Sequence, residues 1–329
     1  MAKHHKPREG STAYWHRKRA KRIYPRMSVL PSVKEAAPLV FAGYKAGMTS
    51  VSYVDAKKGS HTEGQEVMKA ATVLDCPPLS VCGIRLYEKT AYGAKCVGAA
   101  WAEKLSKDLP RKTSLPEKNE SKKSVDKLEK LIDDGSEVRL LVSTNPRQSG
   151  IGKKTPELFE VGIGGGAKAA FEYAKSKLGS ELRATDVLKQ GQMLDARAVT
   201  QGRGYTGPVV RYGIRVRSRK NKGKMRHVGN LGPQNPPKVI PGGKVPEAGQ
   251  MGFHNRTEYN KKVLKTGAGG INPKGDWVNY GRVSGDYVII EGSVPGPKKR
   301  LIMLRPAMRK KGWTDNPIEL RYVSLEPQN

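Results

Sequence analysis

The chain of 329 residues carries 61 Lys and Arg against 30 Asp and Glu, a formal net charge of +31. Self-repulsion at this charge opposes compaction unless a polyanion neutralises it, which excludes an ordinary enzyme with a balanced surface. No apolar run approaches the roughly 20 residues that span a bilayer, and the N-terminus lacks the apolar core of a secretion signal, so we expect a cytoplasmic protein with a polyanionic partner.

The N-terminal segment concentrates positive charge. Residues 1–29 contain nine Lys or Arg and a single acid, with Tyr14, Trp15 and Tyr24 placed among the cations. No periodic apolar face is visible, so residues 1–32 are predicted to form an extended basic arm rather than a packed element. Aromatic side chains among cations are typical of segments that bind nucleic acid. A solvated, disordered tail is the alternative.

The composition then becomes that of a folded body. Residues 39–54 hold apolar and β-branched residues interrupted by glycines, which predicts a strand, a tight turn and a second strand. Residues 70–76 and 79–87 are also predicted strands, and Pro77-Pro78 between them signals a turn.

An inserted α+β region is predicted over residues 90–190. Its apolar residues recur at helical spacing over residues 125–132 and 167–178, with a short strand between the two helices. A run of glycines at positions 162 and 164–166 precedes the second helix. A phosphate cradle is one interpretation of this run, but the full nucleotide-binding motifs are missing, which favours a plain loop before the helix.

The closing part of the chain returns to β structure. Residues 192–200 alternate like a half-buried strand, and two apolar runs, residues 287–290 and 301–304, flank a turn rich in glycine and proline. We expect these two runs to be neighbouring strands of a sheet or barrel. The predicted fold is mainly β, with a β-rich body over residues 33–90 and 190–305 and a C-terminal tail over residues 306–329.

Residues 196–246 carry the strongest functional signal. This segment of fifty-one residues holds twelve Lys or Arg, no Asp or Glu, and many glycines and prolines. It has few core-forming side chains and cannot bury itself. Its cations suit phosphates, and its glycines allow close approach to a sugar–phosphate backbone. Folded RNA offers clefts in which such a loop gains order on binding.

Alternatives remain for this segment and for the chain. The segment could be a flexible linker, although linkers are usually mixed or acid-balanced in composition. Duplex DNA is a weaker partner, because the segment contains no recognition helix, zinc finger or basic-zipper pattern. For the whole chain, the alternatives are a DNA-packaging protein and a nucleic-acid-modifying enzyme that captures its substrate on a basic surface.

Four motifs, in order along the chain, resemble one family. They are Gly43-Tyr44-Lys45-Ala46-Gly47-Met48-Thr49, Val199-Thr200-Gln201-Gly202-Arg203-Gly204-Tyr205-Thr206-Gly207, the stretch from Gly249 to Lys262, and the turn from Gly292 to Arg300. In these motifs the sequence resembles the universal ribosomal protein L-three family of the large subunit, in its archaeal and eukaryotic form. The resemblance extends over nearly the whole chain.

The resemblance implies a six-stranded, translation-protein-like β-barrel with an inserted α+β region. It also implies that the N-terminal arm and a long loop, residues 201–250, penetrate rRNA. A member of this family is a structural constituent of the large ribosomal subunit that acts in translation, binds rRNA early in assembly and approaches the peptidyl transferase centre without doing chemistry. The implied partners are large-subunit rRNA and neighbouring proteins of the L-fourteen and archaeal L-twenty-four types, with the chain a monomer within the ribosome.

The sequence departs from the family pattern in the loop. The loop tip is expected near residues 232–237, where relatives carry a tryptophan. Gln234 stands in its place, so Gln234 and Asn235 are expected to hydrogen-bond with RNA instead. Lys222 stands near the position of the modified histidine of eukaryotic members, and that modification is therefore not expected. Gln250 matches the glutamine that is methylated in bacterial members, and we expect it to be unmodified here.

The candidate rRNA-binding residues share a cationic, aromatic, imidazole or amide side chain. In the arm they are Lys3, Lys6, Arg8, Trp15, Arg17, Lys18, Arg19, Arg22 and Arg26. In the loop they are Arg203, Arg211, Arg215, Arg217, Arg219, Lys220, Lys222, Lys224, Arg226, His227, Gln234, Asn235, Lys238 and Gln250. In the motifs that follow they are His254, Arg256, Lys261, Lys262, Lys298, Lys299 and Arg300.

No catalytic or metal site is predicted. Three cysteines without a CxxC pair indicate neither a disulfide framework nor a structural zinc site. The histidines lack metal-ligand spacing, and the sequence contains no nucleophile and base whose spacing supports a catalytic pair. We therefore expect a protein that is not an enzyme and binds no cofactor.

Overall fold

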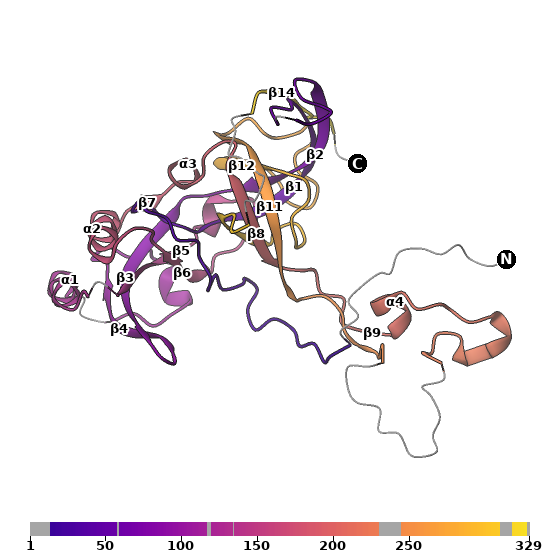
Figure 1. The fold of residues 1–329 in the computed structure, drawn as a ribbon, viewed down its shortest axis with the longest axis horizontal. Coiled ribbons are helices and arrows are strands. Elements are labelled where there is room, and N and C mark those ends of the chain that lie inside the picture. The colour runs from indigo at the N-terminus through magenta and orange to yellow at the C-terminus, as the bar shows by residue number, and fades with distance from the viewer. Residues whose placement is uncertain are drawn as a thin grey trace, which may run out of the picture. The chain divides into compact units, whose positions relative to one another are not determined.

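The computed structural model describes residues 14–57, 59–116, 120–133, 135–229, 245–309 and 318–327 (Figure 1). The chain divides into two compact units. The first, here called the basic unit, comprises Met1–Arg22 and Val199–Asn255. The second, here called the body, comprises Ile23–Ala198 and Arg256–Asn329. Strands dominate the described residues, so the prediction of a mainly β fold is confirmed.

A closed barrel of six strands lies at the centre of the body. Its strands are β1 (Phe41–Val54), β2 (Glu66–Asp75), β8 (Met193–Val199), β11 (Asn255–Ala268), β12 (Asp286–Glu291) and β13 (Leu301–Pro306). They follow the order β13-β8-β11-β12-β2-β1, and β1 pairs antiparallel with β13, which closes the ring. Closure leaves these strands without open edges. The six-stranded barrel implied by the resemblance is therefore present.

Strand β1 corrects the prediction of a strand, a turn and a strand over residues 39–54. It is one continuous strand that bulges between Lys45 and Gly47. A Cβ at Gly47 would overlap the ring of Trp277, which is almost wholly buried. The glycine therefore serves close packing of an indole against the strand rather than a turn.

The expectation that residues 287–290 and 301–304 form neighbouring strands is wrong. They lie in β12 and β13, which are separated by β8 and β11 on one side of the ring and by β2 and β1 on the other. The turn between the two runs is too long for a tight hairpin. Its conformation is stabilised by Lys45 of β1. The Lys45 ammonium donates to the carbonyl oxygens of Val294 (2.8 Å) and Gly296 (3.1 Å).

The C-terminal tail contributes one further strand. β14 (Leu320–Val323) pairs antiparallel with the second half of β1, outside the ring of six. Residues 310–317 of the predicted tail lie outside the described residues.

The inserted region forms a second, five-stranded antiparallel sheet. Its strands are β3 (Leu79–Thr90), β4 (Gly93–Trp101), β5 (Glu137–Ser143), β6 (Leu158–Gly162) and β7 (Glu181–Leu182). Its helices are α1 (Ser121–Lys130), α2 (Ala167–Lys177) and α3 (Ala184–Val187), with short 3₁₀ helices η1 (Leu109–Arg111) and η2 (Pro146–Gln148). Helix α1 packs on β4 and α2 on β5 (Figure 1), which confirms both predicted helices. Because β3 belongs to this sheet, Pro77-Pro78 separates two sheets, and the insertion begins at residue 79 rather than 90.

Residues 23–39 pack on the inserted sheet. Tyr24 is only 5% exposed, and its hydroxyl donates to Leu158 O (2.6 Å). The N–H groups of Gly164 and Gly165 donate to carbonyl oxygens of this segment (2.9 and 2.8 Å). A Cβ at Gly164 would lie 2.7 Å from Glu35 O, so the glycine run allows close backbone approach, which favours the plain-loop interpretation. The basic unit contains the arm only as far as Arg22, whereas the predicted arm extended to residue 32.

A buried polar cluster joins the barrel to the inserted sheet. The Tyr280 hydroxyl donates to Asp75 Oδ2 (2.6 Å), and the Tyr44 hydroxyl donates to Glu157 Oε2 (2.8 Å). Asp75 has no exposed surface, and this burial raises its pKa to about 6 from 3.8. Below about pH 4 the Asp75 carboxyl is protonated in both the folded and the unfolded chain, so its ionisation does not affect stability. As pH rises from about 4 to 6, the unfolded chain loses this proton more readily than the folded chain, and the folded state becomes less stable.

Replacing Asp75 with asparagine is therefore expected to change how stability depends on pH. The free energy of unfolding of the Asp75→Asn variant, minus that of the wild type, should grow by about 2–3 kcal/mol between pH 4 and pH 7. Urea unfolding at several pH values measures this difference. Asp126→Asn, which removes an exposed acid of α1, provides the control. A difference for Asp75→Asn that grows no more than that for Asp126→Asn would contradict the assigned shift.

Candidate nucleic-acid interface

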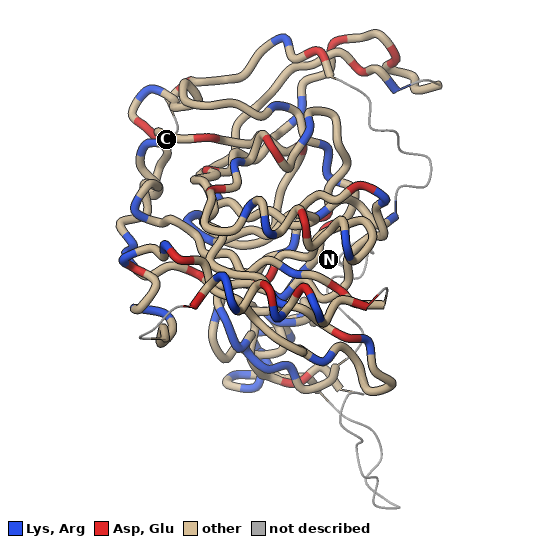
Figure 2. Tube along the Cα trace, turned by 90° about the vertical axis from the view of Figure 1, so that its left-hand side faces the viewer, with Lys and Arg blue, Asp and Glu red and all other residues tan. Residues whose placement is uncertain are grey.

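The basic unit has almost no acidic side chains. Its described residues carry fourteen Lys or Arg and one acid, Glu247. Over the whole chain, Lys and Arg outnumber acids about two to one. Figure 2 marks both kinds of residue along the described parts of the chain. The excess of charge that the composition shows is therefore concentrated in this unit, which makes it the candidate interface for a polyanion.

Backbone hydrogen bonds hold together the base of the loop. The short strands β9 (Tyr205–Thr206) and β10 (Gly249–Gln250) pair antiparallel. Arg203 N–H donates to Met251 O (2.9 Å), and Met251 N–H donates to Gly204 O (2.9 Å). Gly252 has a φ of +71°, and a Cβ there would overlap Gln201 O, so only glycine fits at this crossing.

Further along, the loop has local structure of its own. Helix α4 (Pro208–Tyr212) ends at Gly213, whose φ of 65° and N–H bond to Val209 O (3.0 Å) form a left-handed cap. The 3₁₀ segment η3 (Arg219–Lys224) follows, and Arg217 N–H donates to Met225 O across it (3.1 Å). Most cations here are exposed, namely Arg215, Arg219, Lys220, Lys222, Lys224 and Arg226, whereas Arg211 and Arg217 are half-buried.

The arm is attached to the base of the loop. Ala20 N–H donates to Phe253 O (2.8 Å), and His254 Nδ1 donates to Lys18 O (3.1 Å). The rings of Tyr14 and Tyr212 meet edge to face with centroids 4.9 Å apart. These contacts join two segments that are far apart in the sequence, so residues 14–22 are part of one ordered unit with the loop.

The arm and the loop enclose a shallow, cation-lined cavity of about 550 Å³. It is lined by residues 16–20 of the arm and by Gln250 and Phe253 of the loop. The Gln250 side-chain amide donates to Met251 O (3.2 Å) and Gly252 O (3.1 Å). These bonds hold the amide in the turn at the loop base, which leaves its side-chain carbonyl oxygen to accept from a ligand.

Most of the predicted site residues that the structure describes are gathered in the basic unit. They are Trp15, Arg17, Lys18, Arg19, Arg22, Arg203, Arg211, Arg215, Arg217, Arg219, Lys220, Lys222, Lys224, Arg226, His227, Gln250 and His254. Arg26, Arg256, Lys261, Lys262, Lys298, Lys299 and Arg300 belong to the body. Lys3, Lys6, Arg8, Gln234, Asn235 and Lys238, together with the predicted loop tip, lie outside the described residues.

Several predicted cations of the body have partners within the chain. The Lys298 ammonium donates to Val278 O (2.7 Å), and Lys261 forms an ion pair with Glu258 (2.8 Å). Burial lowers the pKa of Arg300. Lys299 is exposed, with a positive φ of 68°. The Lys298 bond ties the turn at residues 292–300 to Val278, whereas the Lys261 ion pair lies within β11.

One aromatic residue in the loop was not among the predicted site residues. Tyr205, in β9, is 80% exposed, more than Trp15 at 65%. It directly follows Arg203-Gly204, and an aromatic residue beside an arginine in a glycine-rich stretch is a sequence signal for base stacking. This signal could have placed Tyr205 with the other candidates.

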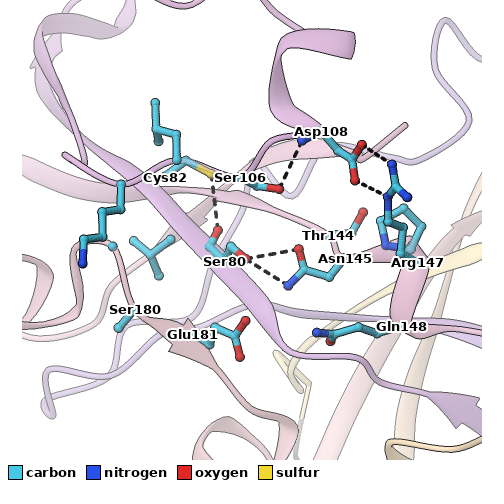
Figure 3. A pocket seen from close by; sticks show the side chains of 15 residues that line it. Ser80, Cys82, Ser106, Asp108, Thr144, Asn145, Arg147, Gln148, Ser180 and Glu181 are labelled. Carbon is cyan, nitrogen blue, oxygen red and sulfur yellow. Dashed lines mark hydrogen bonds and ion pairs between the residues drawn. The ribbon is translucent and has the colours of Figure 1, made fainter. Parts of the chain in front are cut away.

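The described residues show no constellation suited to catalysis or metal binding. A pocket of about 370 Å³ in the inserted region (Figure 3) is lined by polar groups that bond one another: Ser80 with Asn145, and Asp108 with Arg147 (2.8 Å). Burial raises the pKa of the Cys82 thiol, which keeps it unreactive. No group of three His, Cys, Asp or Glu among the described residues could hold a metal ion. No described helix is both long and apolar enough to cross a membrane.

Comparisons with known proteins agree with these features. The family model of ribosomal protein L3 matches residues 1–327. The chain is 46% identical to a protein of Methanothermobacter thermautotrophicus named large ribosomal subunit protein uL3, over 98% of each chain. Proteins of the same name from Methanobrevibacter smithii (42%, over 99% of this chain and 98% of the relative) and Archaeoglobus fulgidus (44%, over 98% of each) are similar along their length. The barrel, the acid-poor loop and this full-length similarity together show that the chain belongs to the ribosomal protein L3 family.

Proposed function

We propose that the chain is a structural constituent of the large ribosomal subunit that binds large-subunit rRNA through its basic unit. The observation that carries the proposal is the ordered scaffold of arm and loop, which presents fourteen cations against one acid. The protein acts in translation as part of the ribosome in the cytoplasm and performs no chemistry of its own. The family assignment does not support the alternatives of a nucleic-acid-modifying enzyme or a DNA-packaging protein.

The geometry supports recognition of the RNA backbone more than of base sequence. Exposed Arg and Lys side chains neutralise phosphates, and arginine can grip a phosphate with two parallel N–H bonds. Trp15 and Tyr205 present exposed rings on which unpaired bases can stack. Because hydrogen bonds already fix the base of the loop and the arm, RNA binding orders fewer residues and costs less entropy.

The finer features of the family are proposed for this chain as well. The loop continues beyond the described residues to a tip near residues 232–237, where Gln234 and Asn235 hydrogen-bond with rRNA near the peptidyl transferase centre. The cations of the body listed above add contacts at its surface. Binding takes place early in subunit assembly, and the neighbours are proteins of the L-fourteen and archaeal L-twenty-four types.

Sedimentation of ribosomes tests the proposal. An affinity-tagged chain expressed in an archaeal host should migrate with large subunits and remain with them after a high-salt wash, because many cations are engaged with folded rRNA at once. A small protein from the ribosome surface that carries the same tag is the control for non-specific trapping of tagged protein with the subunits. A chain found mainly in the free pool, or on DNA, would overturn the proposal.

A further inference from the structure

The hairpin that joins β3 and β4 is exposed to solvent at its tip. Every residue from 88 to 97 is exposed. The register pairs Glu88 with Lys95, Lys89 with Ala94 and Thr90 with Gly93. The Thr90 hydroxyl donates to Gly93 O (2.7 Å), and Gly93 has a φ of 118°. A hydrogen bond therefore closes the turn, although none of its side chains is buried.

Tyr92 lies at this turn with its whole side chain in solvent. Its exposed fraction is 102%, above that of any other large apolar or aromatic side chain among the described residues. The residues around it are small, since Ala91, Gly93 and Ala94 are its neighbours along the chain. Both faces of the ring are consequently open. A fully exposed aromatic ring of this kind can stack on a base of any identity, since every base has a π-face.

Two lysines flank the ring. Lys89 and Lys95 are both exposed, and among the described residues neither ammonium has an ion-pair partner. Because Lys89 pairs with Ala94 while Lys95 pairs with Glu88, the two lysine side chains lie on opposite faces of the ribbon. A strand of nucleic acid that crosses the tip therefore meets a cation on each side of the aromatic ring.

We propose that the tip of the β3–β4 hairpin is a second RNA contact, in which Tyr92 stacks on an unpaired base and Lys89 and Lys95 bind the flanking phosphates. This inference rests on the proposed function, but it concerns a surface of the inserted region that has no part in the arm or the loop. RNA fits the tip better than a protein does. A protein hot spot is an aromatic anchor surrounded by further contacts that exclude water. Here small residues adjoin the ring, and the charged residues of the tip are Lys89, Lys95 and one acid, Glu88.

Binding of full-length large-subunit rRNA to the full chain tests the contact. The Tyr92→Ala variant should bind about 5- to 160-fold more weakly than the wild type, the range expected for loss of one base stack. Tyr92→Trp should bind within about twofold of the wild type, because an indole also stacks. Leu131→Ala is the control for the loss of an exposed apolar side chain, since Leu131 is 49% exposed in the same region and has no aromatic ring on which a base could stack.

The outcomes separate this inference from the proposed function. If the wild type itself fails to bind rRNA, the proposed function is wrong. If the wild type binds and Tyr92→Ala binds equally well, only the hairpin contact is wrong. An equal loss for Tyr92→Ala and Leu131→Ala would also overturn it, because the effect would then be general to the region.

Crosslinking in assembled subunits distinguishes RNA from protein at the same site. With Tyr92 replaced by photoreactive p-benzoylphenylalanine, irradiation of purified large subunits should join the chain to rRNA. A crosslink to another ribosomal protein would overturn the inference, and so would the absence of any adduct while a probe at Tyr205 crosslinks to rRNA.

Discussion

Replacing Arg215, Arg219, Lys220 and Lys224 together with glutamine is expected to weaken binding to large-subunit rRNA by at least about tenfold at moderate salt. All four side chains are exposed and lie on the part of the loop that surrounds η3. Glutamine keeps a polar side chain that can form hydrogen bonds but has no charge, so the loss reports mainly phosphate neutralisation. Filter binding or fluorescence anisotropy with transcribed rRNA measures it.

A variant of equal net charge provides the control. Lys122, Lys123, Lys127 and Lys130 are exposed on α1, and changing them to glutamine also removes four positive charges. If the position of the cations matters, this variant should keep most of the affinity. Equal losses in the two variants would mean that overall charge, rather than the basic unit, determines binding.

Removing the outer loop is expected to abolish tight rRNA binding while the body stays folded. The variant replaces residues 208–246 with a short glycine–serine linker and retains β9 and β10. None of the described residues that are removed (208–229, 245 and 246) belongs to the hydrophobic core of the body, whose ring is closed by the pairing of β1 with β13. The midpoint of thermal unfolding should therefore change by only a few degrees, whereas rRNA affinity should fall by orders of magnitude.

Circular dichroism during heating and rRNA binding on the same sample check this variant. The Asp75→Asn variant provides a comparison in which the change lies in the body instead. A loss of the folded body after removal of the loop would mean that the loop is part of the structural core. Retained rRNA affinity would mean that the body, and not the loop, binds the RNA.

Helices and strands could be predicted where their own residues show a periodic or continuous apolar pattern. Helix α2 was predicted because Ala170, Phe171 and Ala174 lie at helical spacing, and these side chains are buried. Strands β8, β12 and β13 were predicted from alternation or from short apolar runs. Such patterns identify which face of an element is buried, but they do not identify the partner that buries it.

The wrong predictions concern which strands pair. β12 and β13 are consecutive strands joined by a turn-rich link, yet they do not pair with each other: β12 pairs with β11 and β2, and β13 pairs with β8 and β1. Residues 70–76 and 79–87 were both assigned to the β-rich body, whereas β2 and β3 belong to different sheets. Pairing depends on non-local contacts that composition does not reveal.

The candidate interface also has parts that the sequence predicts and parts that it does not. Its cations could be predicted because an acid-free basic segment is visible in the sequence. The attachment of the arm to the loop could not, because it uses backbone groups of Ala20 and Phe253, which leave no signature in the side chains. Tyr92 was missed since exposure of a single aromatic residue at a turn becomes visible only when the packing around it is known.

The dependence of rRNA affinity on salt tests the central claim most directly. If the basic unit neutralises several phosphates at once, the logarithm of the association constant should fall linearly with the logarithm of salt concentration. The slope for the wild type should be about −4 or steeper. In the loop variants the slope should become shallower by roughly 0.7–0.9 for each phosphate contact that is removed. A wild-type affinity that barely changes between low and moderate salt, or a slope unaltered by removal of the loop, would contradict the account.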